Sequence, residues 1–110
     1  MIFRRSGRFD DLVRTQLDFL TEDETDLLAE AQSADEAWTR AGRDEAEELY
    51  GDYQLVVDAI GDRLLDVRER YALSLAGDAA DEYRAAFTRA ATKRFRRYAS
   101  LLADPEDDAT

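Results

Sequence analysis

Residues 44–75 read DEAEELYGDYQLVVDAIGDRLLDVRERYALSL, and this stretch decides the fold of the chain. Its apolar residues recur every three or four positions, which places them on one stripe of a long helix. The stripe comprises Ala46, Leu49, Tyr53, Val56, Ile60, Leu64, Val67, Tyr71 and Leu75. At about 1.5 Å per residue the helix would be roughly 48 Å long. A rod of this kind cannot bury its stripe alone, so the sequence predicts partner helices.

A second helical pattern precedes this stretch, over residues 9–41. Its seam steps by fours and threes through Phe9, Val13, Leu17, Leu20, Glu24, Leu27, Ala31, Ala34, Trp38 and Ala41, as in a heptad repeat. Glu24 occupies a position that should be apolar, and it ends a capping-box sequence that starts at Thr21. Either one helix continues through Glu24, with a kink or an acidic layer, or a second helix starts at Glu22 with Thr21 as its N-cap. The unbroken register favours one helix.

Two glycines followed by aspartates mark the turns of the chain. Gly42 and Gly77 suit a left-handed residue after a helix, while Asp44 and Asp78 suit the N-cap of the next one. A third helix follows, with an apolar face that reaches Leu102. Because short turns make neighbouring helices antiparallel, we predict an all-α, up-down-up three-helix bundle. Residues 9–102 would form this single domain, between a basic N-terminal arm (1–8) and a disordered acidic tail (103–110).

The composition limits the classes of function. The 110 residues suit one domain, and they include neither cysteine nor histidine, which excludes disulfides, thiol nucleophiles and histidine-based catalysis or metal binding. The net charge of −11 would repel nucleic acid and anionic membranes. No apolar run is long enough to span a bilayer and no signal peptide is evident, so we expect a cytoplasmic protein. No cofactor is predicted.

Two polar residues fall on apolar faces of the expected bundle. Glu24 lies 15 positions after Phe9, and Arg94 lies 15 positions after Ala79. Since the first and third helices of an up-down-up bundle run in parallel, the two side chains should lie at similar height. We therefore expect a half-buried Glu24–Arg94 pair that fixes the register between helices.

Acidic residues gather at the start of the long helix. Glu45, Glu48 and Asp52 share a helix face and could bind Mg²⁺. The sequence EELYGD at 47–52, followed by two valines, superficially resembles the acidic helix of all-α nucleoside-triphosphate pyrophosphatases. That family pairs Glu-x-x-Glu on one helix with Glu-x-x-Asp on the next; here the second spacing is one residue too long and the first motif is missing. The simpler interpretation is that these acids favour the positive end of the helix dipole.

Residues outside the stripes indicate an interaction surface. It would combine outward apolar side chains with the basic face of the third helix: Leu12, Phe19, Leu55, Leu65, Leu73, Arg89, Lys93, Arg96 and Arg97. The basic face could complement the acidic helices of its own chain, or bind an acidic partner or a second copy. The sequence favours a non-catalytic interaction or scaffold protein that forms a homodimer, with no residue assigned to catalysis. The alternative is a divergent Mg²⁺-dependent hydrolase of the pyrophosphatase type.

Overall fold

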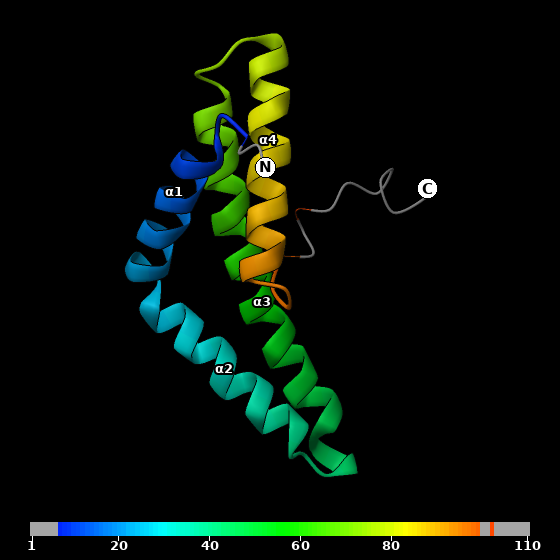
Figure 1. The fold of residues 1–110 in the computed structure, drawn as a ribbon. Coiled ribbons are helices and arrows are strands. Elements are labelled where there is room, and N and C mark those ends of the chain that lie inside the picture. Colours follow the sequence, from blue (N-terminus) through cyan, green and yellow to red (C-terminus); the bar gives the residue numbers. More distant parts are fainter. Residues whose placement is uncertain (1–6, 100–101, 103–110) are drawn as a thin grey trace, which may run out of the picture.

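The computed structural model describes residues 7–99 and Leu102 as an all-α protein (Figure 1). Four helices are present in that part of the chain: α1 (Asp10–Asp23), α2 (Thr25–Thr39), α3 (Arg43–Ala72) and α4 (Gly77–Arg94). The all-α prediction is confirmed, whereas the count of three helices is not, because the first predicted helix is divided into α1 and α2. Most of the predicted basic arm and all of the predicted acidic tail lie outside the described residues.

The division falls at Glu24, which ends α1 and precedes α2 with φ −108° and ψ 32°. The ribbon bends sharply there (Figure 1). An uninterrupted helix is therefore excluded, whereas the kink that the sequence allowed at Glu24 is present. The alternative with Thr21 as N-cap is wrong, since Thr21 lies inside α1 and its hydroxyl donates to the carbonyl of Leu17 (2.8 Å). The seam nevertheless keeps its register across the bend, because both Leu20 and Ala31 are buried.

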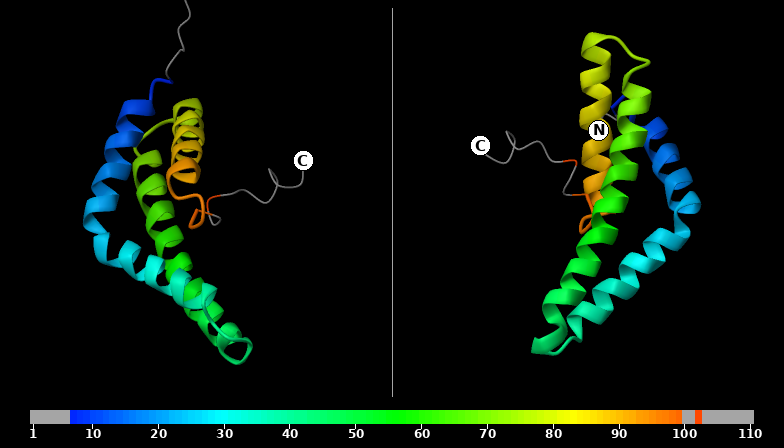
Figure 2. Two further views of the ribbon diagram at one scale, coloured as in Figure 1. Left: turned by 60° about the horizontal axis from the view of Figure 1, so that its bottom comes forward. Right: turned by 180° about the vertical axis from the view of Figure 1, so that it is seen from behind.

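Helix α3 is the longest helix, and both α2 and α4 pack against it. Helix α2 lies along the first half of α3 and α4 along the second half, while α1 packs beside α4 (Figures 1 and 2). Helices α1 and α4 run in the same direction, opposite to α3. At the top of Figure 1 the three helices α1, α3 and α4 therefore lie together, whereas at the bottom α2 and α3 form a two-helix hairpin.

Only one of the two turns contains the predicted left-handed glycine. Gly77 does adopt a left-handed conformation, with φ +38°, which suits glycine because it lacks a Cβ. Gly42 is extended instead (φ −75°, ψ 170°) and directly precedes α3. The predicted N-caps are wrong: Gly42 and Ala76 occupy the N-cap positions, and neither helix start has a side-chain cap. Asp44 and Asp78 lie in the first turn instead, where a carboxylate interacts favourably with the helix dipole.

The core lies where α1, α3 and α4 meet. Leu17, Ile60, Leu64, Tyr83 and Phe87 are all at most 1% exposed. After α4 ends, the chain turns back and adds further apolar side chains to the same cluster, namely Phe95, Ala99 and Leu102. No charged residue is buried anywhere in the segments that the structure describes. The predicted stripe of the long helix thus forms the centre of the molecule.

The tip of the α2–α3 hairpin is less well covered. Trp38 is 36% exposed and Tyr50 is 45% exposed, although Trp38 stacks on the buried Tyr53 with ring centroids 5.8 Å apart. Trp38, a member of the predicted seam, is therefore not part of the buried core, and neither is Tyr50 beside it. The reason is the length of α4, whose 18 residues reach along only part of the 30 residues of α3.

None of the helices in the described part of the chain has the length and apolar character needed to cross a membrane.

Candidate interaction surface

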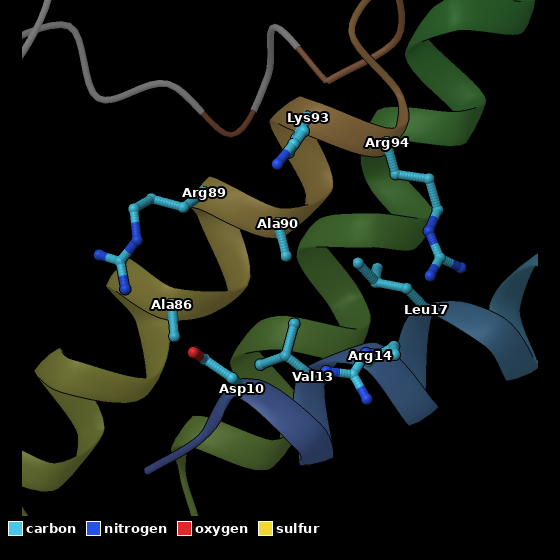
Figure 3. A pocket seen from close by; sticks show the side chains of 9 residues that line it. All are labelled: Asp10, Val13, Arg14, Leu17, Ala86, Arg89, Ala90, Lys93 and Arg94. Atoms are coloured by element: carbon cyan, nitrogen blue, oxygen red, sulfur yellow. The ribbon is translucent and has the colours of Figure 1, made fainter. Parts of the chain in front are cut away.

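A groove of about 700 Å³, open to solvent, runs between α1 and α4 (Figure 3). It is lined by Asp10, Val13, Arg14 and Leu17 from α1 and by Ala86, Arg89, Ala90, Lys93 and Arg94 from α4. On each helix these positions are three or four residues apart, so they share one face. The short side chains of Ala86 and Ala90 leave the space between the helices. We call this feature the basic groove.

The floor of the basic groove is apolar and its rim is positively charged. Val13, Leu17, Ala86 and Ala90 lie between the helices, while Arg89 and Lys93 extend from α4 (Figure 3). The lining contains four cations and a single carboxylate, on a chain whose net charge is −11. The groove is therefore a local reversal of the charge of the protein.

The four cations differ in how far they are neutralised. Arg94 pairs with Asp18 of α1 at 2.8 Å, and Arg14 pairs with Asp11 at 3.2 Å on the exposed surface. Within residues 7–99, neither Arg89 nor Lys93 forms an ion pair with a carboxylate. These two side chains are exposed and can bind an anionic group from outside the chain.

The other residues of the predicted interaction surface are scattered. Phe19, Leu55 and Leu73 are 64%, 70% and 80% exposed, and they do not belong to the groove. Leu12 and Leu65 are half-buried against the core.

The last two predicted cations also lie outside the groove. Arg96 is exposed, and Arg97 forms an ion pair with Asp35 of α2. The internal complement expected for the basic face thus holds for Arg97, whereas Arg89 and Lys93 face outward.

The predicted Glu24–Arg94 pair is wrong in its partners. Glu24 accepts a hydrogen bond from Nε of Arg63 on α3 (2.7 Å), and Arg94 pairs with Asp18. The prediction assumed that the first and third helices begin at the same height. Asp18 lies eight residues into α1, but its partner lies seventeen residues into α4, so the two helices are offset along their axes.

The acidic start of α3 does not form a cage of ligands. Glu45, Glu48 and Asp52 are all exposed. Over the residues that the structure describes, no three or more carboxylates lie close enough together to hold a metal ion. The three side chains come from a single helix, and no second helix presents carboxylates to them. The metal-dependent alternative gains no support from this geometry.

Polar side chains at the helix interfaces join the helices to one another. The hydroxyl of Tyr83 donates to Oε1 of Gln16 (2.7 Å), which ties α4 to α1, and burial raises the pKa of Tyr83 to about 12. The hydrogen bond from Arg84 lowers the pKa of Glu69, which also accepts one from Arg68. These contacts fix the packing of α3 and α4.

Sequence reasoning missed the groove because its floor residues belong to the core stripes. The available signal was the pair of alanines at 86 and 90, four positions apart on a face where larger side chains would be expected. Comparison with known proteins adds nothing further: no family model, no curated protein and no solved structure matches the chain.

Proposed function

We propose that this protein is a small, cytoplasmic, non-catalytic helical interaction protein that associates with itself through outward apolar helix faces, with a homodimer as the smallest assembly. The observation that supports this proposal is the exposure of three large apolar side chains. Phe19 lies on α1, Leu55 lies on α3, and Leu73 directly follows α3. A contact with a further helix would remove such a side chain from water, which is favourable for each apolar side chain that it covers.

The basic groove is a second reason for favouring binding over catalysis. It is shallow and open, and its polar groups are arginines and a lysine. Such side chains recognise anions through charge and donated hydrogen bonds. The 110 residues also contain neither histidine nor cysteine.

Sedimentation velocity over a concentration series from micromolar to millimolar tests the proposal. We expect the sedimentation coefficient to rise with concentration, because mass action favours the associated state. A chain that stays monomeric throughout the series would show that self-association is not its function.

The hydrolase alternative is separated by thermal unfolding in the presence of Mg²⁺ or Mn²⁺. A metal-binding enzyme would be stabilised by mass action, and the effect would be lost in an Asp52→Asn variant. The proposed interaction protein would show only the small change expected from charge screening, the same in the variant and the natural chain. A saturable, Asp52-dependent stabilisation would favour the enzyme.

A further inference from the structure

A stripe of carboxylates runs along the outward face of α3. Glu48, Asp52 and Asp62 are exposed, and Leu55 lies among them with 70% of its surface exposed. The four residues are spaced by four, three and seven positions, so they share one side of the helix. In the part of the chain that the structure describes, none of the three carboxylates forms an ion pair. We call these four residues the acidic ridge.

The acidic ridge and the basic groove are complementary in both charge and polarity. The ridge presents one apolar side chain between carboxylates, and the groove presents an apolar floor beside the unpaired Arg89 and Lys93. An open groove admits the side of a helix, whereas small ligands are usually enclosed much more completely. Complementary potentials of this kind speed encounter and fix the register of a contact.

We propose that the basic groove of one copy binds the acidic ridge of a second copy, with Leu55 on the apolar floor and the neighbouring carboxylates paired with Arg89 and Lys93. This inference rests on the proposed self-association and specifies which surfaces meet. Because the ridge and the groove are different surfaces of the same chain, the contact is heterologous. The copies join head to tail, and such a contact produces either a closed ring or an open filament of copies.

The other exposed leucine of α3 is a poorer candidate for the same contact. Leu73 is 80% exposed, but the two carboxylates nearest to it along α3, Asp66 and Glu69, are already neutralised. Asp66 pairs with Arg63 and Arg70, and Glu69 likewise pairs with two arginines. A second copy would gain no new ion pair there, so Leu73 serves as a matched control for Leu55.

Two variants test the proposal by sedimentation velocity on the full chain. The groove variant carries Arg89→Glu and Lys93→Glu, and the ridge variant carries Leu55→Ser. Each should raise the dissociation constant of self-association by roughly tenfold or more, through charge repulsion or loss of the apolar contact. All three residues are exposed, so far-UV circular dichroism should show that both variants keep the helical fold.

Matched controls carry the same chemical changes elsewhere. Arg40→Glu with Arg43→Glu alters the net charge as much as the groove variant does, but at the hairpin tip. Leu73→Ser matches the ridge variant. Both controls should associate like the natural chain.

Mixing the two variants separates a head-to-tail contact from other kinds of association. The ridge variant retains an intact groove, and the groove variant retains an intact ridge. An equimolar mixture should therefore form a heterodimer that grows no further, although neither variant associates alone. Variants that weaken association but fail to complement one another would overturn the head-to-tail arrangement.

The remaining outcomes distinguish this inference from the proposed function. A natural chain that associates, with both variants associating equally well, overturns the inference and leaves the proposed function intact. A natural chain that stays monomeric overturns both. If the groove instead binds an amphipathic anion, decanoate will stabilise the monomer saturably and the groove variant will lose that effect; this result also overturns the inference.

Discussion

Replacement of Tyr83 by phenylalanine should change the stability of the fold in a way that reverses with pH. Tyr83 is fully buried, its ring centroid lies 4.8 Å from that of Tyr71, and its hydroxyl donates to Gln16 at 2.7 Å. The variant keeps the ring and loses only this hydrogen bond. Near neutral pH we expect it to be less stable by about 1 kcal/mol, the usual net value of such a bond.

At high pH the ionisation of the phenol works against the natural chain. Burial raises the pKa of Tyr83 from 10.0 to about 12 in the folded state. The neutral phenol therefore stabilises the fold fully below pH 10, and this contribution is lost as the pH rises from 10 towards 12. Near pH 11 the natural chain has lost about 1.4 kcal/mol, the equivalent of one pKa unit.

The two effects are of similar size, so the order of stability should change. Tyr83→Phe is the less stable protein near neutral pH and should equal or exceed the natural chain near pH 11. Urea denaturation followed by circular dichroism at both pH values gives the two free energies of unfolding. The raised pKa of Tyr98 affects both proteins equally and cancels in the difference. A difference that stays constant over the whole pH range would refute the reasoning.

Three further predictions concern stability. Leu64→Ala removes a fully buried side chain from the centre of the core, so urea denaturation should show a loss of about 2–5 kcal/mol; a loss below about 1 kcal/mol would mean that the core is not packed as described. A double-mutant cycle of Glu24→Ala and Arg63→Ala should give a coupling free energy of about 0.2–1 kcal/mol, since both side chains are partly exposed. A coupling of zero would show that the ion pair between the bend and α3 does not stabilise the fold. Glu69→Gln should destabilise the fold at neutral pH, because the hydrogen bond from Arg84 stabilises the charged carboxylate and lowers its pKa in the folded state. This stabilisation is lost as the carboxyl is protonated, so the difference in unfolding free energy between the natural chain and the variant should shrink as the pH falls through and below 4.5. A difference that does not depend on pH would contradict this role.

The long helix was predictable because the apolar spacing that indicates it lies within one continuous stretch, residues 44–75. Ile60, Leu64 and Tyr53 recur with helical spacing, and all three are buried. The helical class follows from that periodicity alone, since the same spacing would scatter apolar residues over both faces of a strand.

The partners of polar residues were not predictable, because they depend on how far one helix slides along another. Arg94 meets Asp18 and Glu24 meets Arg63, and both contacts join helices that are far apart in the sequence. The bend at Glu24 has the same origin: the capping signal and the continuous seam conflict locally, and the contact with α3 accompanies the break.

The helical class, the apolar side of each helix and the acidic character of the chain can all be read from the residues in order, because these properties depend on composition and local spacing alone. Three features emerge only in three dimensions: the position of the break in the first helix, the extent to which α4 covers α3, and the placing of Arg89 and Lys93 beside an apolar floor formed by α1 and α4. Such features arise from the relative placement of helices distant in sequence, which local periodicity does not encode.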